Sequence, residues 1–186
     1  MKIQELDIKG PLLIHPDIYS DDRGYFFESF NENKFRGFGI PNNFVQDNQS
    51  LSSKNVLRGL HFQKPPYEQG KLVRVVKGAV LDIIVDIRTD SPTFGQNYKV
   101  RLDENNKLIL WIPPGFAHGF LSLEDNTIFF YKCTAFYNKS SESGILWNDK
   151  ELGIDWGTTE PIVSEKDNEL PSFAQYKLQV IDHMKN

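Results

Sequence analysis

The sequence predicts an all-β fold, a two-sheet sandwich or barrel, with a few short helices that lie mainly near the C-terminus. Short segments of alternating apolar and polar residues recur at roughly 8–12-residue spacing, and clusters of Gly, Pro, Asn and Asp separate them. Fourteen phenylalanines and seven tyrosines favour strands over helices. A chain of 186 residues fits one domain, residues 1–186, and can bury a sizeable core.

The first part of the chain predicts strands that are punctuated by turns. Apolar alternation marks strands at residues 2–9, 12–15, 25–30, 44–52 and 56–63. Asn31 can cap a short helix, which Gly37 and Gly39 stop quickly. The turn at 53–55 makes the last two of these strands neighbours.

The second part continues the pattern and ends in an irregular tail. Strands are expected at residues 72–77, 79–87, 98–102, 107–112, 118–123 and 127–137. Gly78 joins the first two, and the turn cluster 103–106 separates the next two. From Ser140 onward at most one or two short helices are expected, near 167–170 and 173–176.

Composition excludes several classes of protein. The formal net charge of −4 and the pI near 5.6 argue against binding to nucleic acid polymers or anionic membranes. Cys133 is the only cysteine, so an internal disulfide or a cysteine metal cluster is impossible. Residues 1–7 are too charged for a signal peptide, and no run approaches the ~20 apolar residues of a membrane span. We therefore expect a cytoplasmic protein.

The stretch Arg58-Gly59-Leu60-His61-Phe62-Gln63 contains the first candidate functional residue. Strand alternation places Arg58, Leu60 and Phe62 on one face and Gly59, His61 and Gln63 on the other. If the second face is internal, His61 looks into a barrel and can exchange protons near neutral pH. The alternative is a core histidine that is bonded to a backbone carbonyl.

A second motif narrows the fold class to a jelly roll of the cupin type. Residues 113–118 match the second cupin motif, P-x-G-x-x-H, which ends at His118. Cupins that bind metal need two histidines one residue apart in the first motif, but Gln63 stands in the second position. We therefore expect no catalytic metal. An immunoglobulin-like sandwich is the weaker alternative.

Without a metal, a histidine base needs a carboxylate that orients its ring. Asp47, Asp82, Asp86 and Asp167 are candidates, and spacing does not choose among them. Lys71 and Arg58 lie near His61 in the sequence and would supply positive charge. Taken alone, Lys71 and Arg23 would be expected to be solvated surface side chains. Tyr131 taken alone would be expected to be a buried structural ring that is satisfied by one hydrogen bond.

Seven ordered blocks resemble one known family, the dTDP-4-dehydrorhamnose 3,5-epimerases, over about residues 6–176. The first is Arg23-Gly24-Tyr25-Phe26-Phe27-Glu28-Ser29-Phe30, which resembles the family's R-G-x-F-x-E-S-F. The others are residues 44–50, 56–63, 69–75, 113–120, 131–134 and 164–167. The chain departs from the family at Gln49, where His is commoner, and at Phe62, where Tyr is commoner. We expect Gln49 to point away from the face of Asn48.

The resemblance implies a jelly-roll homodimer that uses no cofactor and acts on a dTDP-4-keto-6-deoxy sugar. It implies that His61 is the general base, Asp167 its carboxylate partner, Tyr131 the acid, and Lys71 the group that steadies the enolate oxygen. It also implies substrate contacts at Arg23, Glu28, Gln46, Asn48, Arg58, His118, Glu142 and Lys166, with Tyr19 and Tyr137 packing on the thymine or sugar.

The implied activity is epimerisation at C3 and C5 beside the C4 ketone, in dTDP-L-rhamnose biosynthesis. Two groups on opposite faces of the sugar are needed, because one base would return each proton where it came from. The alternatives are an epimerase that acts at C3 or C5 only, a ketoisomerase, and a sugar-binding cupin without catalysis. A complete set of base, acid and cation disfavours the last.

Overall fold

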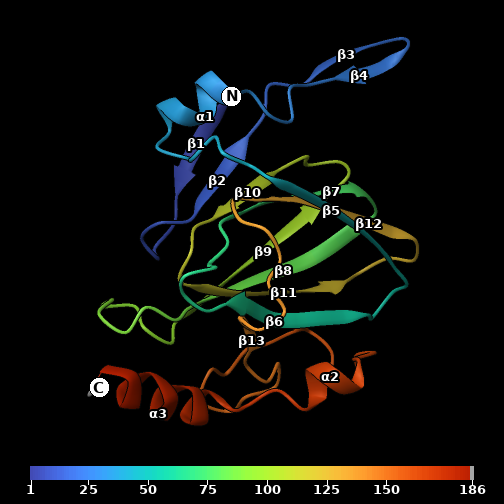
Figure 1. Cartoon of the computed structure of the whole chain (residues 1–186). Helices are drawn as coiled ribbons and strands as arrows, with labels where there is room; N and C mark the ends of the chain where they lie inside the picture. The colour runs from blue at the N-terminus through green and yellow to red at the C-terminus, as the bar shows by residue number, and fades with distance from the viewer. Residues whose placement is uncertain (185–186) are drawn as a thin grey trace.

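The chain forms two facing antiparallel sheets and a separate hairpin in a computed structural model that describes residues 1–184, and side chains as far as residue 180. Figure 1 gives the arrangement. The first sheet has the spatial order β1 (Lys2–Glu5), β2 (Leu12–His15), β10 (Ile109–Ile112), β7 (Lys71–Lys77), β12 (Thr127–Cys133), β5 (Gln46–Ser52). The second has the order β13 (Glu142–Gly144), β6 (Leu57–Gln63), β11 (Phe116–Ser122), β8 (Ala79–Asp86), β9 (Asn97–Asp103). The hairpin consists of β3 (Tyr19–Asp21) and β4 (Gly24–Phe26).

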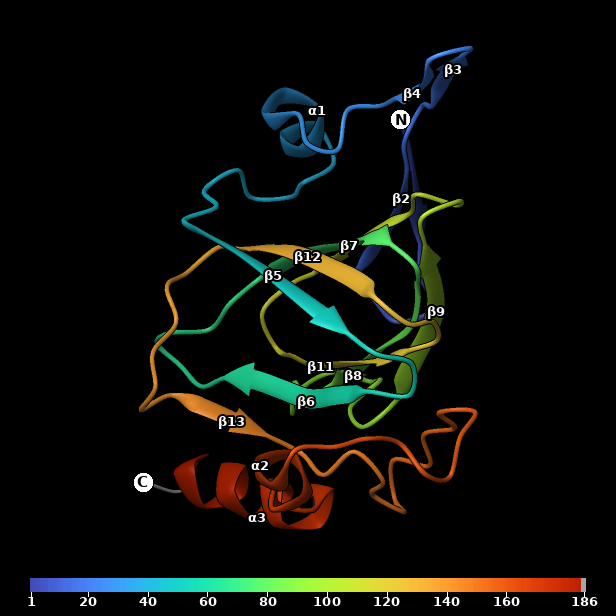
Figure 2. The same ribbon diagram turned by 90° about the vertical axis from the view of Figure 1, so that its right-hand side faces the viewer.

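From β5 onward the chain crosses repeatedly between the sheets, which is the topology of a jelly roll and confirms the predicted fold class. The prediction that residues 44–52 and 56–63 are neighbouring strands is wrong. β5 and β6 lie in different sheets, as Figure 2 shows. The turn between them passes through Asn55 with φ 66°, and the crossing from β7 to β8 passes through Gly78 with φ 77°. Both residues have a left-handed backbone conformation, which directs the chain from one sheet to the other and not back along the same sheet as a hairpin.

The main core lies between the two sheets. Alternate residues of β7, β8, β11 and β12 point inward and are buried, among them Val73, Ile84, Phe120 and Phe129. The rings of Phe120 and Phe129 stack across the two sheets with centroids 4.2 Å apart. This apolar layer fills most of the space between the two sheets. Polar side chains face the remaining part of the barrel interior.

A second core lies between the outer face of the five-stranded sheet and the C-terminal segment. It contains Ile83 and Val85 of β8 together with Phe173 and Tyr176 of the helix α3 (Phe173–Met184). The Tyr176 hydroxyl donates to the Ile87 carbonyl oxygen at 3.0 Å. The tail predicted as mostly irregular is therefore anchored to the sheet, and α3 is longer than the predicted 173–176. No described helix is long and apolar enough to cross a membrane.

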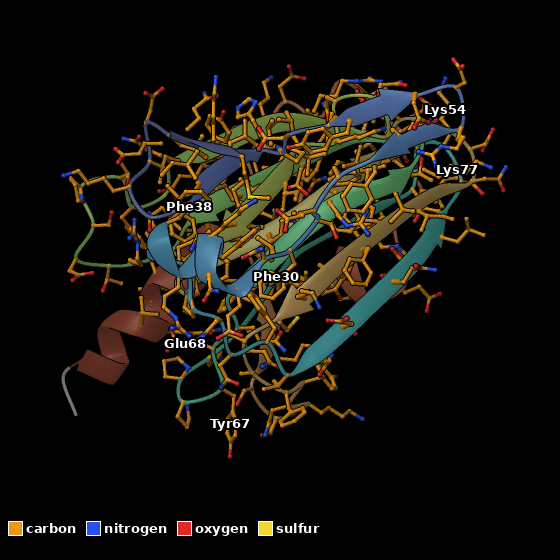
Figure 3. All side chains as sticks on the ribbon, turned by 90° about the horizontal axis from the view of Figure 1, so that it is seen from above. Phe30, Phe38, Lys54, Tyr67, Glu68 and Lys77 are labelled. Carbon is orange, nitrogen blue, oxygen red and sulfur yellow. The ribbon has the colours of Figure 1, made fainter. Side chains whose placement is uncertain are left out.

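A third apolar cluster holds the short helix α1 (Glu32–Gly37) against the six-stranded sheet, with Phe30 and Phe38 beside it (Figure 3). Asn31 caps α1 as predicted, because its side chain accepts a hydrogen bond from the Lys34 backbone N–H. Other element boundaries differ from the prediction. β1 ends at Glu5, β4 at Phe26 and β12 at Cys133, and the tail contains the unpredicted strand β13.

An irregularity in β6 decides which of its side chains face the barrel interior. Leu57, Leu60 and Phe62 all belong to the outer core, so two-residue alternation fails between Leu57 and Leu60. Gly59 has φ 135°, and a Cβ there would lie 2.5 Å from the Cα of Gly119. Opposite it, the pairing with β11 shifts register between His118 and Phe120.

The predicted faces of this strand are therefore partly wrong. Arg58 does not share a face with Leu60 and Phe62, because the irregularity at Gly59 breaks the alternation. Arg58 and His61 instead line the same cavity, and Gln63 does not line it.

Asp86 closes the turn that follows β8 and is fully buried. Its carboxylate accepts hydrogen bonds from Arg88 Nε at 2.8 Å, Ser91 Oγ at 2.6 Å and Thr93 Oγ1 at 2.6 Å. Burial acts to raise the pKa of Asp86, but these hydrogen bonds outweigh it and lower the pKa to about 2. The charged carboxylate therefore stabilises the folded state.

We predict that Asp86→Asn lowers the free energy of unfolding at neutral pH by about 2 kcal/mol, because the depressed pKa represents that stabilisation. The stabilisation is complete above the unfolded-state pKa of about 4 and is lost as the pH falls through about 2. The difference in free energy of unfolding between the wild type and the variant should therefore become smaller as the pH falls over that range. Urea unfolding at a series of pH values measures it.

The matched control is Asp155→Asn, since Asp155 is an exposed carboxylate that pairs with Lys99 at 3.2 Å on the surface. We expect little change in that variant, because exposed ion pairs contribute little. An Asp86→Asn protein that is as stable as the wild type at every pH would contradict the assignment.

Candidate active site

A cavity of about 640 Å³ lies between the two sheets, a volume that suits a small-molecule ligand. Side chains from both sheets and from the segment around the helix α2 (Glu165–Asn168) surround it. Its lining includes eight of the fourteen predicted site residues: Asn48, Arg58, His61, Lys71, His118, Tyr131, Lys166 and Asp167. The fold thus brings together residues that are up to 119 positions apart in the sequence, from Asn48 to Asp167.

His61 and Asp167 form a hydrogen-bonded pair at one wall of the cavity. The His61 Nε2 lies 2.7 Å from Asp167 Oδ1, and Asp167 Oδ2 accepts the Gly59 backbone N–H at 3.2 Å. The Ser164 side chain caps α2 by accepting from the Asp167 backbone N–H. Burial acts to raise the pKa of Asp167, but the interaction with His61 and the hydrogen bonds from Gly59 and Ser164 together outweigh it, so the pKa lies below its usual value. The carboxylate therefore stays charged and holds His61 with Nδ1 free to act as a base.

Tyr131 and Lys71 belong to the opposite sheet. Tyr131 lies on β12 and packs against Phe129, with ring centroids 6.1 Å apart. Burial raises the pKa of the Tyr131 hydroxyl, which therefore stays protonated at neutral pH and can donate. Lys71 lies at the start of β7, and its Nζ is 3.5 Å from the His61 carbonyl oxygen.

The four candidate carboxylates each bond to a different basic side chain. Asp167 bonds to His61, whereas Asp82 Oδ2 lies 2.9 Å from Nε2 of His118. Asp86 holds Arg88, and Asp47 pairs with Lys132 at 2.9 Å. Spacing in the sequence did not separate these cases, because the partners come from strands and helices that only the fold brings together.

Three further predicted residues lie at the rim. The side-chain amide of Gln46 makes two hydrogen bonds. Its Nε2 donates to Asn48 Oδ1 at 3.0 Å, and its Oε1 accepts the Tyr137 backbone N–H at 2.9 Å. Glu142 pairs with Lys166 at 2.6 Å and accepts the Tyr137 hydroxyl at 2.9 Å. These contacts connect Gln46, Glu142 and Tyr137 to residues of the lining, although the three do not line the cavity.

The last three predicted residues lie away from the cavity within this chain. Tyr19 is 65% exposed on the hairpin that projects from the barrel in Figure 1. Arg23 at its tip pairs with Asp21, and Glu28 bonds to Asn31 and Lys34. A single chain does not bring them to His61.

Gln63 is held by backbone groups and not by a ligand. Its Nε2 donates to the Phe136 carbonyl oxygen at 3.2 Å, and its Oε1 accepts the Asn138 backbone N–H at 2.6 Å. Among the side chains of residues 1–180, no three from His, Cys, Asp or Glu gather closely enough to hold a metal ion. The expectation of a reaction without metal stays a prediction.

Sequence reasoning missed several residues of the site. Ser50, Phe120 and Phe129 line the cavity. Asp82, a carboxylate candidate from the sequence, lies behind His118 and not beside His61. Ser50 is two residues from Asn48 on a strand, so alternation already placed it on the same face. Gln49 is exposed, as the inward direction of Asn48 predicts, although part of it also belongs to the cavity lining.

Chemically, the cavity places a histidine and a protonated tyrosine on opposing walls. β6 and β12 belong to different sheets, so a ligand between them meets His61 on one side and Tyr131 on the other. Arg58, Lys71 and Lys166 supply positive charge around it. Such a site can remove a proton from one face of a ring and return one to the other.

Comparisons with known proteins agree with this geometry. The family model described as dTDP-4-dehydrorhamnose 3,5-epimerase matches residues 5–175. The Escherichia coli K12 dTDP-4-dehydrorhamnose 3,5-epimerase is 51% identical over 172 residues, which cover 91% of this chain and 93% of that protein.

Two solved structures are also similar. The Legionella pneumophila RmlC epimerase in complex with dTDP-4-keto-L-rhamnose is 44% identical with a TM-score of 0.91, and the match covers 96% of both chains. ChmJ, a 3′-monoepimerase from Streptomyces bikiniensis in complex with dTDP-quinovose, is 34% identical with a TM-score of 0.90, covering 95% of this chain and 90% of that one.

Proposed function

Because this chain belongs to the dTDP-4-dehydrorhamnose 3,5-epimerase family, we propose that it converts dTDP-4-dehydro-6-deoxy-D-glucose to dTDP-4-dehydro-L-rhamnose. The observation that carries the proposal is the opposition of the His61–Asp167 pair and Tyr131 across one cavity. Inversion needs a base and an acid on opposite faces, and this cavity has both.

Proton removal is assigned to His61. Its Nε2 hydrogen is directed to Asp167 Oδ1, so Nδ1 carries the lone pair that takes the proton from C3 or C5. The C–H electron pair moves to the C4 ketone, whose oxygen becomes an enolate. The ammonium of Lys71 is proposed to stabilise that charge where it develops.

Reprotonation is assigned to Tyr131. Its hydroxyl gives a proton to the carbon from the opposite face, the enolate returns to the ketone, and the configuration inverts. The tyrosinate and the protonated His61 then exchange protons with water, which restores both groups. One cycle at C3 and one at C5 complete the double inversion.

Substrate binding is assigned to the cations and amides around the mouth of the cavity. Arg58 and Lys166 suit the diphosphate, because guanidinium and ammonium groups bind phosphate oxygens strongly. Gln46, Asn48, Glu142 and His118 offer polar contacts, and the exposed ring of Tyr137 offers a surface for the thymine or sugar. No cofactor enters this scheme.

A second candidate function is inversion at one position only. The similarity to ChmJ, a 3′-monoepimerase, supports this alternative, because the two chains share the overall fold at a TM-score of 0.90. His61 and Tyr131 serve either reaction.

The test of the function counts solvent deuterium in the 4-keto sugar by NMR. The wild type in D₂O should exchange the hydrogens on both C3 and C5 and yield inverted product. Exchange at a single carbon identifies a single-position epimerase. Exchange at neither carbon, with dTDP-sugar binding retained, identifies a binding protein and refutes the proposal.

We predict that His61→Ala and Tyr131→Phe fail differently. His61→Ala should abolish both exchange and inversion, with a loss near the upper end of the ~10²–10⁴-fold range for a positioned acid or base. Tyr131→Phe keeps the ring, so exchange should persist to some degree while inverted product falls sharply. The measurements are deuterium incorporation, product analysis and thermal melting.

Tyr98→Phe is the matched control for Tyr131→Phe, because both rings pack against the same core but Tyr98 does not line the cavity. It should retain full activity. A folded His61→Ala protein with near-normal epimerisation would end the assignment of the base.

We also propose a homodimer in which the N-terminal strands and the hairpin contact a second copy. β1 is the edge of the six-stranded sheet and is exposed along its length, so its outer backbone groups are available for pairing. Tyr19, Tyr25 and Phe26 of the hairpin are 65%, 57% and 67% exposed. Such a contact offers a route by which Tyr19, Arg23 and Glu28 reach the partner's cavity.

We predict a mass by light scattering of twice the 21.5 kDa of one chain. Phe26→Ser should weaken the dimer, because it removes an exposed aromatic anchor from the hairpin. Leu178→Ser is the control, since Leu178 is 64% exposed on α3, across the barrel from the hairpin. A wild type with the mass of one chain, or equal dissociation in both variants, would contradict this interface.

A further inference from the structure

A second histidine–carboxylate pair lies beside the proposed base. His118 on β11 stands directly opposite His61 on β6 in the strand register. Its Nε2 lies 2.9 Å from Oδ2 of Asp82 on β8, the strand on its other side. Asp82 is fully buried, and the His118 side chain is 7% exposed.

The burial of Asp82 is not explained by packing. Val80 and Ile84, its neighbours on the same face of β8, are apolar residues of the main core. A buried carboxylate is expensive unless both oxygens are satisfied, and an apolar replacement for such a pair is often neutral or stabilising. Yet Oδ1 of Asp82 has no hydrogen-bond partner within the described part of the chain. The charge therefore needs a role other than stability.

The titratable groups around the cavity near Asp82 are mostly cationic or neutral. In the opposite sheet β7 contributes Lys71 and β12 contributes Tyr131, and in the same sheet as Asp82 β6 contributes His61 and Arg58. Cys133 of β12 is outside the lining but near enough to Lys71 to interact with it electrostatically. The carboxylate of Asp167 on α2 is already bonded to His61. Within the described part of the chain, the Lys71 ammonium donates to the His61 carbonyl oxygen at 3.5 Å, and no carboxylate forms an ion pair with it.

Asp82 acts in the same direction on the pKa of two neighbouring side chains, Lys71 and His118. Burial lowers the pKa of Lys71, and the charges of Cys133 and Asp82 act against that change. Burial also lowers the pKa of His118, and Asp82 again acts against it. Asp82 is the one carboxylate that favours the charged form of both side chains.

We propose that Asp82 is a positioning residue of the epimerase reaction: it fixes the His118 ring through Nε2 and holds Lys71 as an ammonium where the enolate oxygen forms. The inference rests on the proposed function. Asp82 does not line the cavity, whereas His118 does, so the imidazole stands between the carboxylate and the ligand. This placement gives Lys71 a counter-charge without presenting a bare carboxylate to the developing enolate.

The deciding variant is Asp82→Asn, which keeps the shape of the side chain and a hydrogen-bonding group for His118 but removes the charge. We expect kcat to fall by about 10²-fold, comparable with the loss of one electrostatic stabiliser. The alkaline limb of the kcat profile should move to lower pH, because Lys71 then loses its proton more easily. Binding of dTDP, which lacks the keto sugar, should be unchanged.

The matched control is Asp86→Asn on the same strand. Asp86 is as buried as Asp82 and faces the same way, but its partners are Arg88, Ser91 and Thr93. The substitution should lower stability and leave the pH dependence of kcat unchanged. A shift of the alkaline limb in both variants would assign the effect to general destabilisation and overturn the proposal.

A double-mutant cycle with Lys71→Met separates action through Lys71 from action on the fold. If Asp82 acts through Lys71, adding Asp82→Asn to Lys71→Met should cost little further activity, so the two losses are not additive. Additive losses, or a wild-type pH profile in Asp82→Asn, would overturn the inference.

The outcomes also separate the two proposals. A wild type without exchange at C3 and C5 refutes the proposed function and this inference with it, whereas normal wild-type exchange with an unaltered Asp82→Asn profile refutes this inference alone. Asp82→Ser provides a second uncharged variant. Failure of both variants to fold, seen by thermal melting, would assign Asp82 to barrel stability and overturn the proposal.

Discussion

The close approach of β6 and β11 at Gly59 and Gly119 is the constraint on which the cavity depends. A Cβ at Gly59 would lie 2.5 Å from the Gly119 Cα, and a Cβ at Gly119 would lie 2.8 Å from the Arg58 carbonyl oxygen. No side chain fits between the two strands there. The resulting irregularity turns both Arg58 and His61 into the barrel while Leu57 and Leu60 remain in the outer core. It also presents the Gly59 backbone N–H to Asp167, which ties α2 to the strand that carries the base.

The same barrel interior serves two physical purposes. Part of it is a dry layer in which Phe120 and Phe129 stack, and the adjoining part is lined by histidines, amides and cations. Burial changes the properties of these polar groups, since it raises the pKa of Tyr131 and lowers that of Lys71. An apolar layer beside the cavity thus keeps water from screening the charges, which strengthens each electrostatic contact inside it.

The all-β class and the helix cap at Asn31 could be predicted from the sequence, because strand alternation and capping are local properties. The short motifs that contain His61, Lys71, Tyr131 and Asp167 are local too, and they carried the family resemblance. Spacing did not predict which carboxylate meets which histidine: the family resemblance implied Asp167 for His61, and nothing in the sequence paired Asp82 with His118. Asp82 and Asp167 are both plausible from spacing, and only the order of β6, β11 and β8 in one sheet assigns Asp82 to His118. The wrong face for Arg58 has the same origin. Two-residue alternation assumes an unbroken strand, and a register shift caused by contact with a distant glycine is not visible locally.

The two histidine–carboxylate pairs contain the same atoms but differ in exposure. The His61 side chain is 34% exposed and borders the cavity with its second ring nitrogen unbonded, whereas that of His118 is 7% exposed and its partner Asp82 is not exposed at all. A ring that water and ligand can reach is able to exchange protons during turnover. A ring enclosed between Asp82 and the stacked face of Phe129 is held in one orientation and is suited to orient a ligand. The difference in burial, and not in residue type, therefore distinguishes the proposed base His61 from His118, which is suited to orient a ligand. The two lie opposite each other on adjacent strands.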